Sequence, residues 1–210
     1  MKTLECRGIT LSDKQTKICV PITGTDLEEI KEQAEKIANM NPDVVEWRAD
    51  FYDVKDNDET EFEQCLKAIN DNLKNIPIIY TYRTSNEGGE KSIDVDDYCR
   101  LCKYVSEISE KYNVAMIDVE LYENKDRKDI GKLLLDIKST GVKVIGSNHH
   151  FEGTPSEKDI FNVLKTMEEA GADICKIAVM PKEKVDVKTL INASKKANKE
   201  LNAPIITMSM

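Results

Sequence analysis

A chain of 210 residues, 40% hydrophobic and 33% charged, is long enough to bury one sizeable core, so we predict a single domain over residues 1–210. Its formal net charge of -9 disfavours a nucleic-acid partner, because a phosphate backbone would be repelled. The apolar runs are far shorter than the roughly 20 residues that a membrane span needs, and the N-terminus has no secretory apolar segment. We therefore expect a cytoplasmic protein with no membrane partner.

Six cysteines lie at positions 6, 19, 65, 99, 102 and 175, with neither the density of a disulfide scaffold nor the spacing of a zinc site. Cys99 and Cys102 are three residues apart, but they fall in a helical stretch, where that spacing only places two side chains on one face. We predict reduced thiols and no metal site.

Short β-rich runs alternate with longer amphipathic stretches along the chain. Seven runs predict strands, at residues 17–24, 44–51, 77–84, 114–122, 143–149, 173–179 and 203–210. The stretches between them carry helix signals, such as a threonine or aspartate cap in T-D-L-E-E-I, and Pro155 near the start and Gly171 after the end of another. This order predicts right-handed βαβ units and a parallel sheet.

Polar residues inside the strands favour a closed barrel over an open sheet. Period-two alternation separates two faces: Glu46, Arg48, Asp118 and Glu120 lie on one, and Val45, Trp47, Ala49, Ile117, Val119 and Leu121 on the other. An open sheet with helices on both sides needs two apolar faces. A barrel packs one face on helices and builds its site at the carboxyl ends of its strands. We therefore predict an α/β fold, a (β/α)₈ TIM barrel.

The chain ends in strand pattern at A-P-I-I-T-M-S-M, after seven predicted strands. Because a seven-strand barrel exposes two strand edges, we expect a C-terminally incomplete barrel, with its eighth strand and C-terminal helix missing. Residues 1–16 are too short for a βα unit, but they suit a strand or hairpin that plugs the base of the barrel.

Lys176 interrupts the apolar run G-A-D-I-C-K-I-A-V-M-P. An amine attacks a carbonyl only when it is unprotonated, and burial beside Ile174 and Ala178 favours that neutral form. Lys176 is therefore a candidate Schiff-base lysine. The alternatives are a lysine that reaches to solvent from the strand end and one that pairs with an inward carboxylate such as Glu120.

The two histidines of the chain are adjacent, in G-S-N-H-H-F, where the fifth strand ends. Histidine is well suited to moving protons near neutral pH. Parity with Ile145 and Ser147 points His149 inward and leaves His150 outward or in the loop. The alternatives are a paired surface histidine and a metal ligand set, and no partner residues at suitable spacing support the second.

Y-T-Y-R-T-S-N-E-G-G-E places Arg83 at the end of the third strand and Glu87 before two glycines, which permit a sharp turn or close backbone approach. Arg48 and Arg83 suit a fork for a carboxylate or polyol, although arginines inside a barrel also pair with neighbouring acids. Glu46 next to Arg48 leaves both possibilities open.

Six motifs in order along nearly the whole chain resemble those of the type I 3-dehydroquinate dehydratase family. They are E-W-R-A-D at 46–50, T-Y-R-T-S-N-E-G-G-E at 81–90, I-D-V-E-L at 117–121, S-N-H-H-F at 147–151, K-I-A-V-M-P at 176–181 and I-T-M-S-M at 206–210.

The resemblance implies a lyase of the shikimate pathway, in the biosynthesis of chorismate and aromatic amino acids. It would dehydrate 3-dehydroquinate to 3-dehydroshikimate in a barrel that is usually a homodimer, without metal or diffusible cofactor. Lys176 would form the imine, His149 would act as general base and acid, and Glu87 would orient His149. The positions that match substrate-binding residues of the family are Glu46, Arg48, Arg83, Met208 and Met210.

Two departures from the family pattern carry expectations of their own. His150 stands where the family usually has aspartate, and the family continues past M-S-M with further substrate contacts and the eighth strand. We therefore expect the 210-residue chain to have little dehydratase activity. The alternative functions are another Schiff-base barrel enzyme, of the class I aldolase or transaldolase type, and a degenerate barrel that binds a ligand or partner without catalysis.

Overall fold

A computed structural model of the chain describes residues 2–12, 14–53, 58–124 and 126–210. Its main feature is a parallel sheet of seven strands in chain order. The strands are β3 (Cys19–Ile22), β4 (Val44–Arg48), β5 (Ile78–Thr81), β6 (Val114–Glu120), β7 (Lys143–His150), β8 (Ile174–Val179) and β9 (Ile205–Ser209). All seven predicted strands are confirmed, most with ends one to three residues shorter. The second, for example, turns into the short 3₁₀ helix η1 (Ala49–Phe51) after Arg48.

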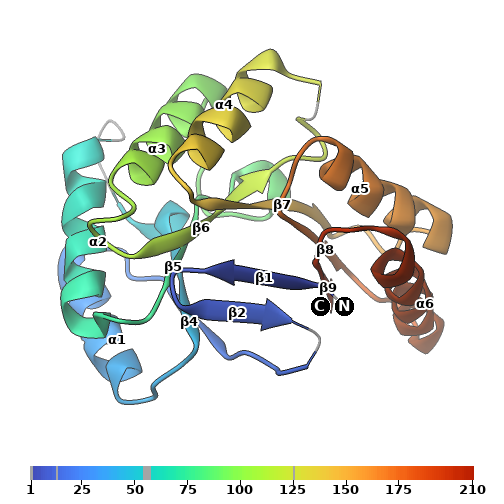
Figure 1. Cartoon of the computed structure of the whole chain (residues 1–210), viewed down its shortest axis with the longest axis horizontal. Coiled ribbons are helices and arrows are strands. Elements are labelled where there is room, and N and C mark those ends of the chain that lie inside the picture. The colour runs from blue at the N-terminus through green and yellow to red at the C-terminus, as the bar shows by residue number, and fades with distance from the viewer. Residues whose placement is uncertain (1, 13, 54–57, 125) are drawn as a thin grey trace.

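In the described ranges there are six α-helices, and they form an arc outside the sheet (Figure 1). They are α1 (Leu27–Ala38), α2 (Glu59–Leu73), α3 (Val95–Glu107), α4 (Lys128–Ser139), α5 (Glu157–Glu169) and α6 (Lys184–Glu200). The predicted cap of α1 is confirmed, because the Asp26 carboxylate accepts the backbone N–H of Glu29. In α5 the cap is Ser156, directly after Pro155. Gly171 follows α5 with a φ of 100°, a conformation that glycine adopts without strain.

The sheet curls but does not close. In the described part of the chain, β3 pairs only with β4 and β9 pairs only with β8, so both are edge strands. The described residues therefore form a curled half-barrel, and the closed eight-strand barrel remains an expectation. None of the helices in these ranges is both long enough and apolar enough to cross a membrane.

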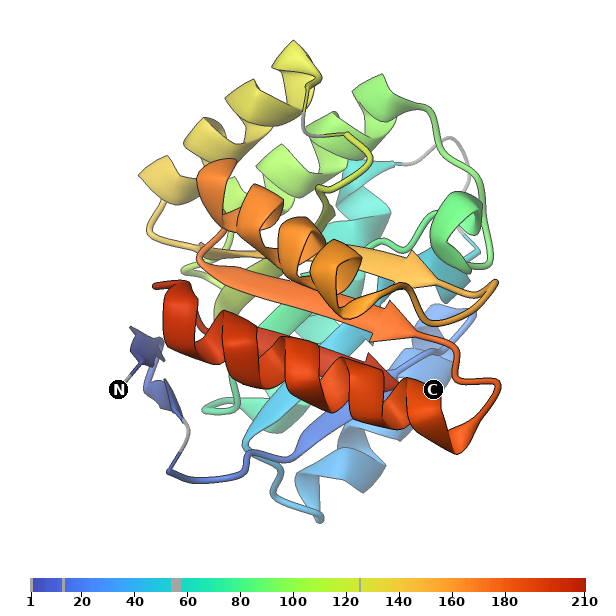
Figure 2. The ribbon, with the colours of Figure 1, turned by 90° about the vertical axis from the view of Figure 1, so that its right-hand side faces the viewer.

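A hairpin of β1 (Thr3–Cys6) and β2 (Ile9–Ser12) fills the base of the curl. Arg7 and Gly8 form its two-residue turn, and both have the positive φ that the tightest hairpins require. Figure 2 shows the hairpin at the end opposite to the arrowheads of the strands. It packs on an apolar floor inside the sheet, formed with Cys6 and Ile9 by Val44, Ala115, Met116, Ile145 and Ile174. The predicted plug is thus confirmed for the described residues of 1–16.

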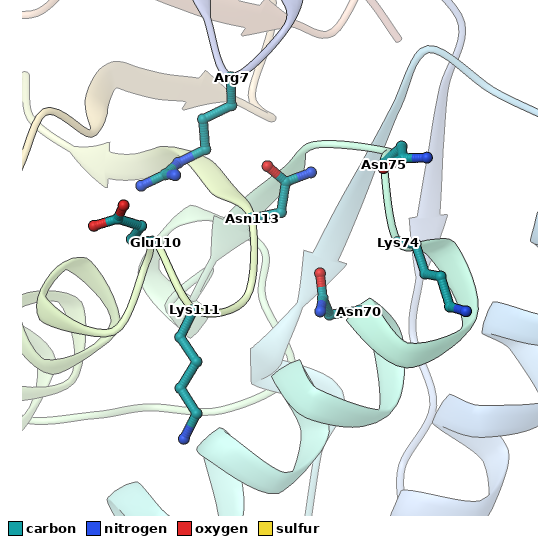
Figure 3. Close-up of a pocket in the computed structure, with 7 residues that line it drawn as sticks. All are labelled: Arg7, Asn70, Lys74, Asn75, Glu110, Lys111 and Asn113. Carbon is teal, nitrogen blue, oxygen red and sulfur yellow. The ribbon is translucent and has the colours of Figure 1, made fainter.

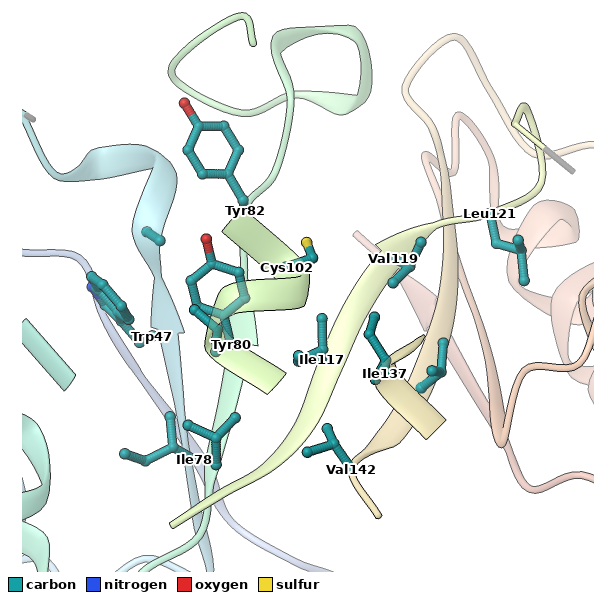
Figure 4. Close-up of a cluster of buried hydrophobic side chains, with 14 of the residues drawn as sticks. Trp47, Ile78, Tyr80, Tyr82, Cys102, Ile117, Val119, Leu121, Ile137 and Val142 are labelled. Atoms are coloured by element: carbon teal, nitrogen blue, oxygen red, sulfur yellow. The ribbon is translucent and has the colours of Figure 1, made fainter. Parts of the chain in front are cut away.

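The main core lies between the outer face of the sheet and the helices. Trp47 of β4 is fully buried, with its ring centroid 5.7 Å from that of Phe62 in α2 and 5.6 Å from that of Tyr80 in β5. Figure 4 shows how Tyr80, Ile117 and their neighbours extend this layer along the strands. The apolar face predicted from parity is therefore the helix-packed face. Cys99 and Cys102 lie in α3, which confirms the helical context predicted for them.

Candidate active site

The inner face of the sheet changes from apolar to polar along β6, β7 and β8. Floor residues Met116, Ile145 and Ile174 are followed two positions later by Asp118, Ser147 and Lys176. Because alternate residues of a strand share a face, these polar side chains line the same interior one level above the floor. Ser147 and Lys176 are paired in register across β7 and β8. The strands thus build a polar layer toward their carboxyl ends, where parallel barrels place their sites.

Lys176 lies in this layer with 12% of its side chain exposed. Its Nζ is 2.8 Å from Asp118 Oδ2 and 4.0 Å from Glu46 Oε1. The Lys176 side chain points inward, as the Schiff-base hypothesis expects. It also forms an ion pair with a carboxylate, which was the alternative interpretation. The partner is Asp118 rather than Glu120. An ammonium held in this way must release a proton before it can attack a carbonyl.

Asp118 is almost completely buried, yet it is ionised. Its Oδ1 accepts hydrogen bonds from Arg83 Nη2 at 2.7 Å and from Ser147 Oγ at 2.5 Å, and its Oδ2 accepts from Lys176. Burial disfavours the carboxylate, but the charges of Arg83 and Lys176 outweigh it and hold the pKa of Asp118 well below its usual range. Sequence parity placed Asp118 on the inner face but gave it no role.

Arg83 is buried among three carboxylates. Besides Asp118, its Nη1 lies 3.2 Å from Glu120 Oε1 and 3.5 Å from Glu87 Oε2, and it donates to Ser147 Oγ at 2.9 Å. Burial opposes the charge, and the surrounding carboxylates more than compensate for it, so the pKa of Arg83 is raised. This arginine therefore links the residues around Lys176 to those around His149.

His149 and Glu87 form the pair that the sequence suggested. His149 Nδ1 lies 2.8 Å from Glu87 Oε2, and Asn148 Nδ2 donates to Glu87 Oε1 at 3.3 Å. Burial, followed by the charge of Arg83, lowers the pKa of His149 to about 4, so its imidazole is neutral near pH 7. Burial raises the pKa of Glu87 to about 7. As the pH falls, the pair therefore takes up its first proton near pH 7.

Gly88 and Gly89 allow the loop that carries Glu87 to pack closely against Phe151 and the backbone of Arg83. Gly88 has a φ of 82°, and a Cβ there would lie 2.2 Å from the ring of Phe151. A Cβ on Gly89 would lie 1.8 Å from the carbonyl oxygen of Arg83. The predicted sharp turn is present, and it places Glu87, in the 3₁₀ helix η2 (Ser85–Glu87), beside His149.

Glu46 and Arg48 lie at the side of the polar layer. Glu46 Oε1 accepts a hydrogen bond from Thr81 Oγ1 at 2.8 Å. Arg48 makes two 2.8 Å hydrogen bonds to Asp50, and its guanidinium lies 5.0 Å from the centroid of the Phe51 ring. Arg48 therefore pairs with Asp50 rather than with Glu46. The proposed fork of Arg48 and Arg83 consists of two guanidiniums that already have carboxylate partners.

Met208 is in the edge strand β9, and Met210 follows the last residue of that strand, Ser209. Met208 is in register with Ala178, two residues from Lys176 along β8, so its side chain belongs to the inner face. The two methionines are 38% and 43% exposed, respectively. They border the site on the side where the described sheet is open.

His150 lies outside this cluster, as parity suggested. It is half-buried, its Nε2 has no hydrogen-bond partner among the described residues, and burial lowers its pKa. Across the described ranges, no group of three or more His, Cys, Asp or Glu side chains is placed to hold a metal ion.

A separate polar hollow has a volume of about 360 Å³. Figure 3 shows the side chains that line it. Its lining consists of Arg7, Asn70, Lys74, Asn75, Glu110, Lys111 and Asn113. Arg7 lies in the turn between β1 and β2, and Asn113 directly precedes β6. The hollow is therefore at the amino ends of the strands of the parallel sheet. The layer that contains Lys176 is nearer their carboxyl ends.

Comparison with known proteins identifies close relatives of the whole chain. The model of a family described as type I 3-dehydroquinase matches residues 18–210. A 3-dehydroquinate dehydratase from Listeria monocytogenes serotype 4a is 38% identical over 211 residues, which cover all of this chain and 81% of that protein. The enzyme of the same description from Bacillus licheniformis is 42% identical, with 100% of this chain and 80% of that protein covered.

Solved structures agree with the sequence matches. A type I 3-dehydroquinate dehydratase from Clostridium difficile, with covalently modified comenic acid, superposes with a TM-score of 0.93 at 36% identity, covering 100% of this chain and 81% of that one. The 3-dehydroquinate dehydratase from Geobacillus kaustophilus gives a TM-score of 0.92 at 30% identity, with coverage of 100% and 79%.

Proposed function

Because this chain belongs to the type I 3-dehydroquinase family, a family of lyases, we propose that it dehydrates 3-dehydroquinate to 3-dehydroshikimate through an imine on Lys176. The observation that carries the proposal is the position of the Lys176 amine, which lies inward among acids on the strand next to the one that bears the paired His149. An amine and a neutral imidazole are the two groups that an imine-assisted elimination needs.

The imine makes the adjacent carbon acidic. When Lys176 condenses with the substrate ketone, the protonated C=N bond withdraws electrons from the neighbouring C–H bond. Loss of that proton gives an enamine, which expels the β-hydroxyl as water and regenerates a conjugated iminium. Hydrolysis of the iminium then releases the enone product and restores the lysine.

His149 is the proton carrier in this scheme. With Nδ1–H donated to Glu87, the neutral ring has its lone pair on Nε2. That nitrogen removes the proton next to the imine and returns it to the departing hydroxyl. The lowered pKa of His149 supports this role, because the ring is unprotonated before the reaction begins.

The substrate is a carboxylate with several hydroxyls, and we assign its contacts to the residues around the layer. Glu46 and Arg48 are the more accessible of the three polar candidates, and Met208 and Met210 provide an apolar wall. Arg83 is buried, so its main effect on substrate is through the charge of the network. We also propose that the protein is a homodimer, which sedimentation analysis of the purified chain would test, and that it acts in the cytoplasm.

Borohydride trapping tests the proposal directly. Reduction in the presence of 3-dehydroquinate should add one covalent adduct to the peptide that contains Lys176, and Lys176→Ala should lose it. Absorbance of the conjugated enone should rise with the native chain and stay flat with Lys176→Ala. Labelling by sugar phosphates alone would instead favour an aldolase, and no labelling by either would favour a barrel without catalysis.

A further inference from the structure

The two oxygens of the Asp118 carboxylate have separate partners. Oδ1 faces Arg83 and Ser147, and Oδ2 faces Lys176 Nζ at 2.8 Å. Asp118 is 1% exposed, so these contacts are shielded from water and salt. The carboxylate is therefore fixed in place by the first two partners, while its second oxygen is directed at the reactive nitrogen.

We propose that Asp118 is the counter-ion of Lys176 throughout the reaction, first of the ammonium and then of the iminium, and that it sets the orientation of the C=N bond. This inference rests on the proposed imine chemistry of Lys176. It assigns a positioning role to a side chain that sequence analysis placed in the interior without a function.

The charge balance of imine formation agrees with a permanent counter-ion. An ammonium and a ketone give an iminium and one water: two of the three N–H hydrogens leave with the ketone oxygen, the C=O bond is replaced by C=N, and one N–H remains. The nitrogen carries one positive charge before and after. Asp118 therefore faces a cation at both stages and need not change its own protonation state.

The single remaining N–H gives the carboxylate its orienting effect. An iminium nitrogen is planar, and its three substituents are Lys176 Cε, the substrate carbon and that hydrogen. If the hydrogen points at Asp118 Oδ2, the substrate carbon must lie on the side away from Asp118. The plane of the C=N bond is then fixed before His149 removes a proton, and fixed geometry of this kind contributes to rate.

The surroundings of Asp118 argue against its acting as the proton acceptor. Arg83 and Ser147 both bind Oδ1, and the nearby positive charges keep the carboxyl ionised. A carboxylate that resists protonation in this way is a poor base but a good counter-ion. Proton transfer is left to His149 and Glu87, which are on the other side of Arg83.

The test compares Asp118→Asn with the native 210-residue chain by two rates, which are expected to change in opposite directions. The first is the acetylation rate of Lys176 by acetic anhydride, read from its peptide by mass spectrometry. Without the carboxylate, the neutral amine is favoured, so this rate at pH 7 should rise about tenfold. The second is the rate of borohydride reduction with 3-dehydroquinate, which needs a protonated imine and should fall about tenfold. Its pH profile should move toward lower pH.

Asp71→Asn is the matched control, because Asp71 also pairs with a lysine, Lys67, but on the exposed face of α2. It should change neither rate by more than about twofold, as exposed ion pairs contribute little. Circular dichroism and the unfolding midpoint verify that Asp118→Asn is folded. The shift of the pH profile of borohydride reduction toward lower pH distinguishes a lost counter-ion from a site that is merely loosened. Equal rates and an unchanged pH profile in folded Asp118→Asn would overturn the inference. Failure of the native chain to be trapped on Lys176 would instead refute the proposed function.

Discussion

Glu87 Oε2 and His149 Nδ1 lie 2.8 Å apart, although 62 positions separate them in the chain. The loop after β5 carries the carboxylate, and the end of β7 carries the imidazole. Their contact selects the tautomer with a hydrogen on Nδ1 and so leaves Nε2 as the basic nitrogen. The loop after one strand thus determines the chemical character of a side chain on another.

The first prediction concerns the pH dependence of the reaction. Protonation of the pair near the pKa of about 7 at Glu87 removes the acceptor of Nδ1–H, so we expect kcat/KM to rise with pH through about 7 and then level off. In Glu87→Gln the rise of kcat/KM with pH should occur below pH 6. Only His149 then titrates, and burial has already lowered its pKa. A pH-rate profile of enone formation measures both. If this rise occurred at the same pH in Glu87→Gln as in the native chain, another group would control it.

The second prediction is that ionised Glu87 lowers the stability of the fold. Burial raises its pKa from 4.5 to about 7, so its stabilising contribution is complete below pH 4.5 and is lost as the pH rises through about 7. The loss is on the order of 3 kcal/mol. Relative to the native chain, Glu87→Gln should therefore gain free energy of unfolding between pH 4.5 and 8. Urea unfolding at several pH values tests this, and a constant difference between the two proteins would contradict it.

The third prediction distinguishes two roles for Arg83: binding of the substrate, and stabilisation of the fold as a buried cation. Removal of this charge leaves Asp118, Glu120 and Glu87 without a shared partner, so Arg83→Met should lower the free energy of unfolding by about 3 to 5 kcal/mol without any ligand. Arg83→Lys should lose less, because it retains the charge but not the planar fork. If Arg83→Met without ligand were as stable as the native chain, the role of Arg83 would be limited to substrate binding.

Parity along the strands predicted much of the fold and of the site. The face of Trp47, the inward turn of His149 and the hairpin at the base follow from period-two patterns and turn residues, which act over short distances. The partner of Lys176 did not follow. Asp118 and Glu120 share a face of β6, and the strand register aligns Glu120, through Ser147, with Lys176. Nζ nevertheless contacts Asp118, while Glu120 is held by Arg83 and Thr84, contacts that parity along one strand does not reveal. The pairing of Arg48 with Asp50 likewise depends on the turn η1.

The fourth prediction concerns the loop that carries Glu87. A Cβ at position 89 would overlap the backbone carbonyl of Arg83, and backbone cannot move as a side-chain end can. Gly89→Ala should therefore displace Glu87 and reduce trapping on Lys176 by tenfold or more, an effect typical of misplaced catalytic groups. Gly131→Ala is the matched control, because a Cβ there meets no atom within 4 Å in α4. It should stabilise the fold by about 0.5 to 1 kcal/mol. Normal trapping in Gly89→Ala would contradict this account of the loop.

The last prediction concerns the rate of the 210-residue chain. In the described residues the sheet is open between β3 and β9, and Met208 and Met210 beside the site are substantially exposed. Water that enters on this side weakens the electrostatic interactions on which an iminium depends. We therefore expect imine trapping on Lys176 to be detectable, but kcat/KM to be at least about tenfold below that of the Listeria monocytogenes relative in the same assay. Equal values for the two proteins would show that the open side does not limit the reaction.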